Sequence, residues 1–443
     1  MLTPLSKKYS DTNDSVDVLI ICALKDEYNQ ILNVTDGLIS PGWVSTKDRN
    51  GRIIAEAAFF NETEQPLTVR ATWASNMGRE QAIAVASSLI QSQNVRCIAM
   101  SGICGGRRGK VALGDVIFAN RLWSYDAGKL INENGEQKLE GDSLQYHPSD
   151  LWEQRMQNLT VSPDTWPITR VSLPLEHQED WVLSKLFIDE DPVQHVDFLK
   201  KCPDWSDVLK RLWKKGLVEK PTTLSATGQK YISEIVLLNP KGLPPVKDFE
   251  VHVAPIATGA AVVEDESLFS KLSEPMRKVL GVDMEASALA AFGDIHGVPV
   301  IVAKAVSDFG DTYKDDRYRD FAAQASAQCL IKLLREGSDL LPNREQSHKI
   351  VDNETSVDKV FTETDLIAVL AEEYPDIRDA RAVWVRAGGK NADVESISRP
   401  TDMWQKIWLR CKQGAHVTPK ALLTAILSDL PENKVLLQQI ALL

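Results

Sequence analysis

Short apolar runs and amphipathic stretches alternate over residues 16–125 and again over residues 250–335, with a more polar region between them. The apolar runs are nearly unbroken, which is typical of parallel strands buried on both faces of a sheet. They occupy residues 16–23, 95–100 and 298–306. Residues 39–75 instead alternate polar and apolar positions, which indicates antiparallel strands.

Helices are predicted between these strands, because apolar positions recur there on one face. They cover residues 78–91, 284–296 and 316–335. The second of these is rich in alanine, so that it can pack closely against a sheet. Strands that alternate with helices in this way favour an α/β fold with a central mixed sheet.

Residues 130–248 are polar, carry several tryptophans and are punctuated by prolines, so we interpret them as a mainly helical insertion. Within it, residues 205–232 (WSDVLKRLWKKGLVEKPTTLSATGQKYI) resemble the helix, wing and helix of a winged-helix module. Such modules often bind DNA. The acidic surroundings and the single copy favour a structural insertion instead.

The C-terminal part of the chain is predicted to be a separate all-α domain. Residues 336–360 are polar and aperiodic, which is typical of a linker, and residues 361–443 contain several helical segments. About 80 residues can form one small bundle. This segment has no glycine-rich loop and no clustered acids, so we expect a binding module here.

Composition narrows the function. The 443 residues predict two or three domains, and the net charge of −12 argues against nucleic-acid or anionic-membrane binding. No apolar window is long enough to span a membrane, and residues 1–15 form a polar, flexible lead-in without a signal-peptide core. The six cysteines are scattered, so we expect neither disulfides nor zinc, no other metal or cofactor, and a cytoplasmic protein.

Two carboxylates follow neighbouring apolar stretches and are the first candidates for chemistry. Glu285 lies in VDMEAS and Asp308 in AVSD, each near the end of a predicted strand. Ligands of open α/β sheets bind beyond the carboxyl ends of the strands, so both side chains are expected at one pocket. Each acid alone could equally be a helix cap or a surface turn residue, and Glu27 could be an acid in the first turn of a helix.

A glycine-rich turn is predicted after the strand at residues 95–100, in SGICGG. Gly102 and Gly105 would let the backbone approach a ligand closely and offer it amide N–H groups. The spacing differs from the common nucleotide-binding fingerprints, so this signal is weak alone.

Four motifs occur in order: CALKDE, SGICGG followed by LGDVI, VDMEASALA and AVSD. With these motifs the first domain, residues 16–335 without the insertion, resembles the nucleoside phosphorylase and nucleosidase superfamily. The methylthioadenosine/S-adenosylhomocysteine nucleosidases are closest in motif. The resemblance implies a three-layer α/β/α domain, a purine nucleoside or nucleotide as ligand, and a homo-oligomer.

The resemblance also implies roles for single residues. Asp308 would be the general acid at the purine, oriented by Ser307, and Glu27 would position or activate the attacking water. Glu285 would bind the ribose hydroxyls and Met284 would pack on the sugar.

The chain departs from the family at several positions. Val262 stands where the nucleosidases place a base-stacking phenylalanine, and Phe309 is a candidate substitute. Arg107 and Arg108 follow the glycines where the small nucleosidases are apolar. These two arginines are candidates for binding a 5′-phosphate or triphosphate.

The C-terminal domain is similar to the helical effector-associated domains of bacterial antiphage conflict systems. Residues 370–389 and 402–414 carry that similarity. It implies a protein partner bound through residues 361–443, and an effector that destroys an adenine nucleotide, with ATP as a candidate.

Three functions stay open at this stage. A second acid such as Glu27 favours a water nucleophile over phosphate, because two close anions repel by roughly 4 kcal/mol at 4 Å for an effective dielectric constant of 20. Hydrolysis by a purine nucleosidase is therefore the leading hypothesis. A phosphate-dependent nucleoside phosphorylase and a non-catalytic nucleotide sensor are the alternatives.

Overall fold

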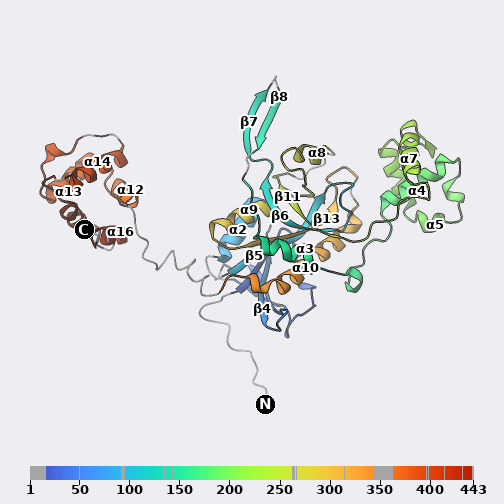
Figure 1. The fold of residues 1–443 in the computed structure, drawn as a ribbon, viewed down its shortest axis with the longest axis horizontal. Helices are drawn as coiled ribbons and strands as arrows, with labels where there is room; N and C mark the ends of the chain where they lie inside the picture. The colour runs from blue at the N-terminus through green and yellow to red at the C-terminus, as the bar shows by residue number, and fades with distance from the viewer. Residues whose placement is uncertain are drawn as a thin grey trace, which may run out of the picture. The chain divides into compact units, whose positions relative to one another are not determined.

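The computed structural model describes most of the chain: residues 16–48, 50–90, 95–133, 136–141, 144–261, 265, 267–313, 315–343, 363–395, 397, 399–413, 415–431 and 433–441. It divides into two compact units, residues 1–351 and 352–443, which are considered separately below (Figure 1). The predicted flexible lead-in and residues 344–360 of the predicted linker lie outside the described residues, as does Val262.

The first unit is built on a mixed sheet, which among the described residues has nine strands in the order β12-β11-β6-β13-β5-β1-β4-β3-β2. Strands β1, β4, β5 and β13 are parallel to one another, whereas β3 and β2 add antiparallel pairings at one edge. The strands are β1 (Val16–Cys22), β2 (Val44–Lys47), β3 (Ile53–Phe60), β4 (Pro66–Trp73), β5 (Val95–Gly106), β6 (Val116–Ser124), β11 (Val251–Thr258), β12 (Gly281–Asp283) and β13 (Val300–Asp308). The predicted α/β class with a mixed sheet is confirmed.

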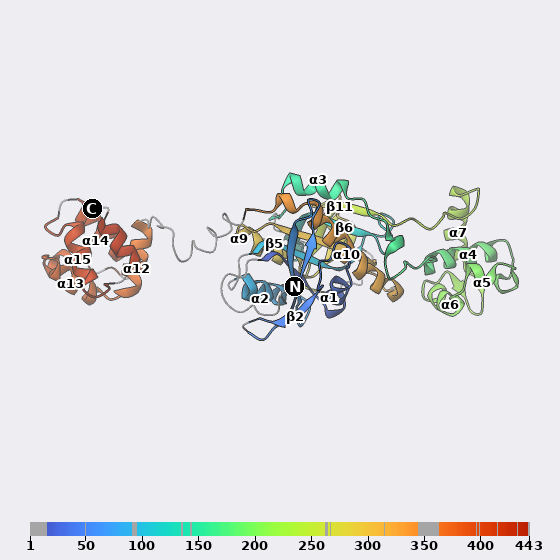
Figure 2. The same cartoon turned by 90° about the horizontal axis from the view of Figure 1, so that it is seen from below.

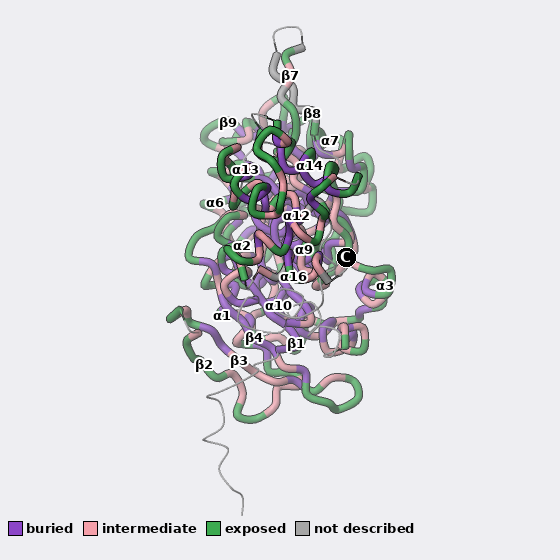
Figure 3. The backbone as a smooth tube through the Cα atoms, turned by 90° about the vertical axis from the view of Figure 1, so that its left-hand side faces the viewer, coloured by how far each residue is buried: buried purple, intermediate pink, exposed green. Residues whose placement is uncertain are grey.

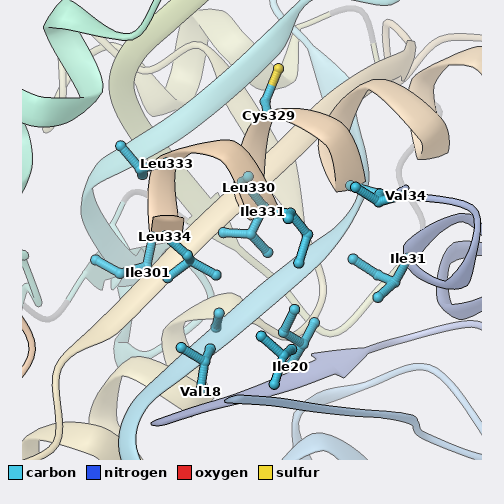
Figure 4. Close-up of a cluster of buried hydrophobic side chains, with 14 of the residues drawn as sticks. Val18, Ile20, Ile31, Val34, Ile301, Cys329, Leu330, Ile331, Leu333 and Leu334 are labelled. Atoms are coloured by element: carbon cyan, nitrogen blue, oxygen red, sulfur yellow. The ribbon is translucent and has the colours of Figure 1, made fainter. Parts of the chain in front are cut away.

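Helices cover both faces of this sheet, which makes the three layers. On one face pack α1 (Lys25–Leu32), α3 (Asp150–Asn158) and α10 (Arg319–Glu336), and on the other α2 (Arg79–Ile90) and α9 (Ala286–Ile295). In Figure 4, Leu330, Ile331 and Leu334 of α10 lie over Val18, Ile20 and Ile301 of the strands. The buried segments follow these strands and the inner helix faces, while the loops are exposed (Figure 3).

The predicted glycine-rich turn is wrong, because SGICGG is the continuation of strand β5 to Gly106. Its residues pair with β13 on one side, and Gly105 and Gly106 pair with β12. The glycines are needed for close packing within the sheet. A Cβ on Gly106 would lie 2.5 Å from Cγ1 of Val306.

The predicted insertion consists of two different parts. The hairpin of β7 (Gly128–Glu133) and β8 (Glu136–Gly141) projects beyond the sheet, and α3 then returns to the core through the buried Trp152 (Figure 1). The later part is a small helical subdomain with its own apolar cluster. Its main elements are α4 (Leu175–Phe187), α5 (Phe198–Lys201), α6 (Trp205–Lys214), β9 (Val218–Glu219), β10 (Thr223–Leu224) and α7 (Ala226–Leu238). The order α6, antiparallel β9–β10 and α7 is the helix, wing and helix expected from the sequence.

Part of the predicted linker belongs to the first unit. After α10, residues Ser338–Leu340 form a 3-10 helix. The guanidinium of Arg96 donates to the carbonyl oxygens of Leu341 and Pro342 and binds Asp17 at 2.7 Å. Partly buried hydrogen bonds hold these residues, although their composition is that of a linker.

The second unit is a helical bundle around a core that includes Trp384, Trp404 and Trp408 (Figure 2). Its helices among the described residues are α12 (Glu363–Glu373), α13 (Ile377–Arg386), α14 (Pro400–Lys412), α15 (Pro419–Leu427) and α16 (Lys434–Ala441). The predicted small all-α domain is confirmed. Across the described part of the whole chain, no helix has the length and apolarity that a bilayer span requires.

Candidate active site

Glu27 lies in the first turn of α1, directly after β1, and only 2% of it is exposed. Its Oε2 accepts a hydrogen bond from the Leu24 amide at 2.9 Å, which caps the helix, and its Oε1 accepts one from the Ile103 amide at 2.9 Å. Helix capping therefore explains the hydrogen bond of Oε2 alone. The other oxygen, Oε1, is held by an amide of strand β5.

Gly102 makes room for this carboxylate. A Cβ at position 102 would lie 2.5 Å from Oε1 of Glu27, closer than any ordinary contact. The same packing applies at Gly105, where a Cβ would lie 2.9 Å from Val282 and 3.6 Å from Oδ1 of Asp308. Both glycines thus border the predicted acids, and their role in binding a ligand stays a prediction.

Glu285 follows β12 and stands at the start of α9, with 3% of it exposed. Its Oε1 accepts a hydrogen bond from the Gly78 amide at 2.8 Å, from the turn that precedes α2. Burial raises the pKa of Glu285, and the nearby Lys304 opposes that shift. Met284, the neighbour predicted to pack on a sugar, is half-buried.

Lys304 is the residue that sequence reasoning missed. It is fully buried in β13, and its Nζ lies 3.4 Å from Oδ2 of Asp283 and 3.8 Å from Oε2 of Glu285. Burial alone would lower the pKa of Lys304, but Asp283 and Glu285 outweigh it and hold the pKa above its usual value. A lysine inside the apolar run VIVAKAV was a signal that the sequence already offered.

The ammonium group of Lys304 also lacks a hydrogen-bond partner among the residues that the structure describes. The Asp283 carboxylate beside it is already occupied, because it accepts from Oγ1 of Thr258 at 2.7 Å and from the Ala286 amide at 3.0 Å. An ammonium has three protons to donate. A buried ammonium whose protons are not hydrogen-bonded can still donate to an acceptor such as a hydroxyl or a water.

Asp308 ends β13 and is less buried than the other acids. Ser307 donates its hydroxyl to Oδ2 of Asp308 at 2.9 Å, as expected of an orienting residue, and the Gly310 amide donates to Oδ1 at 2.8 Å. Phe309 follows and lines a small pocket together with Asp308 and Leu113. Asp308 is therefore held at two points on a turn that borders open space.

The three predicted acids share one electrostatic neighbourhood. Burial raises the pKa of the Cys104 thiol, Lys304 lowers it, and Asp283, Asp308 and Glu27 raise it again. The charge of Lys304 in turn interacts with Asp283, Glu285, Glu27 and Cys104. Strands β1, β5, β12 and β13 thus bring residues that are far apart in the sequence to one place.

The two arginines after the glycines have protein partners. Arg107 donates to the carbonyl oxygen of Arg277 at 3.0 Å. Arg108 forms ion pairs with Asp311 and Glu176, and its guanidinium lies 4.3 Å from the ring centre of Phe309. Their proposed role in binding a phosphate stays a prediction.

One cluster of metal-ligand types lies elsewhere, at Asp115, Glu250 and His252. Oδ2 of Asp115 accepts from the Ala112 amide at 2.8 Å, and Oδ1 accepts from the Glu250 amide at 3.1 Å. His252 lies 3.0 Å from the same carboxylate, so hydrogen bonds within the chain already account for the cluster. We assign no metal to it.

A family model and several known proteins match this chain. A profile described as the Phosphorylase superfamily matches residues 17–336. The uncharacterized protein y4jS of Sinorhizobium fredii is 27% identical over 323 residues, so the alignment covers 72% of this chain and 61% of y4jS. ATP nucleosidase Cap17 of Escherichia coli is 31% identical over 87 residues, which are 20% of this chain and 17% of Cap17.

A solved structure of 5′-methylthioadenosine/S-adenosylhomocysteine nucleosidase from Neisseria meningitidis, in complex with methylthio-immucillin-A, is also similar. Its sequence is 14% identical, the TM-score is 0.41, and the alignment covers 72% of this chain and 98% of that one. The profile match extends over most of the chain and includes every candidate acid described above. The chain belongs to the Phosphorylase superfamily.

Proposed function

We propose that this chain is a purine nucleosidase that hydrolyses the N-glycosidic bond of adenosine or its 5′-nucleotides. The observation that carries the proposal is that Glu27 and Glu285 lie near Lys304, and that Glu27 and Asp308 lie near Cys104, which is itself near Lys304. Breaking this bond requires protonation of a poor leaving base and stabilisation of a sugar that becomes positive. Separate carboxyl groups at one site meet both needs.

In the proposed reaction, Asp308 gives its proton to the purine while the bond between the sugar C1′ and the base breaks. The bonding electrons leave with the base, and a water molecule adds to C1′. Glu27 accepts the proton that this water loses. The products are the free purine and a sugar that carries a hydroxyl group on C1′.

Glu285 and Lys304 are proposed to hold the sugar and the water. Oε1 of Glu285 already accepts from Gly78, which leaves Oε2 to accept from the ribose hydroxyls. Such charge-assisted hydrogen bonds strengthen as the sugar becomes positive. The unpaired protons of Lys304 are then available to orient the attacking water or a hydroxyl oxygen.

Water is favoured over phosphate as the nucleophile because carboxyl groups outnumber the cation in this cluster. Asp283, Glu285 and Glu27 surround the ammonium of Lys304. A phosphate dianion placed there would meet several carboxylates at short range and would be repelled. A phosphorylase is therefore the second candidate, and a sensor without activity the third.

Adenosine nucleotides, with ATP as the finer proposal, are supported by the matched segment of Cap17, whose name states ATP nucleosidase. We further propose a cytoplasmic homo-oligomer that acts as an effector in antiphage defence and is recruited through residues 361–443. A pocket of the second unit offers a partner protein both apolar and charged groups. Its lining includes Trp384, Met403, Ile407, Glu395 and Arg410.

The test is incubation of the full chain with adenosine, AMP, ATP and methylthioadenosine, each with and without inorganic phosphate, followed by chromatography. Free adenine without phosphate is the expected result. Adenine that appears only with phosphate would establish the phosphorylase. Tight binding of a nucleotide without any product, also after addition of a partner protein, would support the sensor.

A further inference from the structure

The segment that follows Asp308, residues 309–313, is contacted by the helical subdomain, residues 174–243. This segment is called the Asp308 turn below. Arg211, on α6, donates to the carbonyl oxygen of Tyr313, and Lys214 donates to that of Thr312 at 2.7 Å. The ring of Tyr313 lies 5.3 Å from Nζ of Lys214 and 5.0 Å from Nζ of Lys215. The basic end of α6 thus surrounds the segment five residues beyond Asp308.

Ion pairs join the two sides of this contact at further points. Arg108 of the sheet domain pairs with Glu176 of α4, and Arg317 pairs with Asp204, just before α6. Arg211 itself is oriented inside the subdomain by Glu179, at 2.6 Å from Nε. The contact is polar and charge-matched, in contrast to the apolar packing of the sheet, and polar contacts of this type between parts of a chain permit relative motion.

The contact is connected to the candidate acid through the backbone of residues 308–313 and the hydrogen bonds that this segment makes. Asp308 is held by the Gly310 amide, and the Tyr313 amide donates to Oδ1 of Asp311 at 2.8 Å. Oδ2 of the same Asp311 binds Arg108, which pairs with Glu176 of the subdomain. The pocket that contains Asp308 and Phe309 is also lined by Leu175, Glu176 and Arg211.

We propose that the helical subdomain is a clamp for the catalytic turn, and that Arg211 and Lys214 are positioning residues that keep Asp308 at the base of the bound purine. This proposal rests on the proposed nucleosidase function for its kinetic consequence. The subdomain uses for this purpose the basic helix next to its wing. In a winged-helix protein that binds DNA, the same face would have to be open.

Lys214→Met is the decisive variant, because Lys214 reaches the turn without being one of the partners of Glu179. We expect kcat for adenine release to fall by about 10- to 100-fold with KM unchanged, because a displaced acid affects the transition state more than ground-state binding. Arg211→Met should have the same effect or a larger one. Lys210→Met is the matched control, since Lys210 is on the same helix, is exposed, and pairs only with Asp207 among the contacts described.

Hydrogen exchange of residues 309–313 gives a readout that does not depend on activity. Loss of the Lys214 contact should speed exchange of this segment by roughly tenfold, while β13 stays protected. If exchange and kcat in Lys214→Met and Arg211→Met match the Lys210→Met control, the clamp is refuted.

The two proposals fail in different ways. If the wild type releases no adenine, but residues 309–313 exchange faster in Lys214→Met than in the wild type, the nucleosidase is refuted and the clamp stands. If the wild type and all three variants release adenine at the same rate, the clamp alone is refuted. Added duplex DNA that competes with the exchange protection of residues 309–313 would show that the α6 face is a DNA site and would overturn the clamp as well.

Discussion

The two ends of the candidate site are built in different ways. At the end with Glu27, Glu285 and Lys304, the residues are 2%, 3% and 0% exposed. The carboxylate of Glu27 accepts from the Ile103 amide of β5, that of Glu285 accepts from the Gly78 amide before α2, and Lys304 lies beside Asp283 and Glu285. At the other end, Asp308 stands on a half-exposed turn whose outer side contacts an inserted subdomain. Core packing fixes the first end, whereas a polar contact supports the second.

This difference separates the sheet core from the inserted subdomain. Strands β1, β5, β12 and β13 are part of the sheet, so a change at the buried end must disturb the core. The insertion can change while the sheet stays intact, which makes the turn at Asp308 the place where control or specificity can be added. Substitutions at the buried end should therefore affect stability and activity together, and those at the turn should affect activity alone.

The largest effect is expected for Asp308→Asn. The amide keeps the hydrogen bond from Gly310 but cannot give a proton to the purine. Adenine release should fall by about 10²- to 10⁴-fold, the usual contribution of general acid catalysis, and the melting temperature should change little. Asp320→Asn, at an exposed position of α10, is the control and should retain full activity. Nearly normal activity in Asp308→Asn would exclude it as the acid.

Lys304→Met tests the buried end. Methionine fits the apolar strand, but Asp283 and Glu285 would be left without their cation. Breaking a buried ion pair from one side costs about 3–5 kcal/mol, so the free energy of unfolding in urea should fall by that amount and adenine release should be lost. Lys278→Met, at an exposed position, should change stability by less than about 0.5 kcal/mol. Equal stability of both variants would contradict this account of the site.

Gly102→Ala should produce a smaller change at the same end. The added Cβ would lie 2.5 Å from Oε1 of Glu27, so the carboxylate has to leave the Ile103 amide. A displacement of this size should lower kcat by about 10- to 100-fold and leave the Asp308 turn unaffected in hydrogen exchange. Gly141→Ala, where no atom lies within 4 Å of the added Cβ, is the comparison. Unchanged kcat in Gly102→Ala would mean that Glu27 does not need its present position.

The sequence predicted the strands of the sheet better than the contacts of the insertion. The apolar runs indicated the strands, because a strand that is buried on both faces consists almost entirely of apolar residues. The motifs around Glu27, Glu285 and Asp308 indicated the candidate acids. The continuation of β5 through SGICGG was missed, since glycines in a row look like a turn and their reason is the room that Glu27 and Val306 need. Lys304 was missed because a single charged residue does not alter an apolar pattern.

The contacts of the insertion could not be predicted at all. They join Lys214 to Thr312 and Glu176 to Arg108, which are far apart in the sequence, through polar groups that also occur on any solvated surface. Hydrophobic periodicity carries no information about such pairs. The wing between α6 and α7 was recognised from local signals, whereas the surface that it faces was not.

The smallest expected effect is on the stability of the helical subdomain, which should depend on pH through Asp180. Asp180, on α4 of the subdomain, has its pKa raised from 3.8 to about 6 by burial, against the lowering effect of a hydrogen bond from Tyr231. A carboxyl with a raised pKa stabilises the fold below its unfolded pKa, and this stabilisation is lost as the pH rises through about 6. Asp180→Asn should therefore be more stable than wild type by about 1–2 kcal/mol at pH 7.5, after allowance for solvent screening.

The difference between Asp180→Asn and wild type should vanish near pH 4, because the wild-type carboxyl is then protonated in the folded subdomain. Thermal unfolding followed by fluorescence of the subdomain tryptophans, Trp181, Trp205 and Trp213, measures it, with the exposed Asp207→Asn as control. A difference independent of pH would show that burial of this carboxyl does not weaken the subdomain. If instead the predicted trend appears, adenine release should follow it in the wild type only, because the clamp contributes to the turn at Asp308 while the buried end does not depend on it.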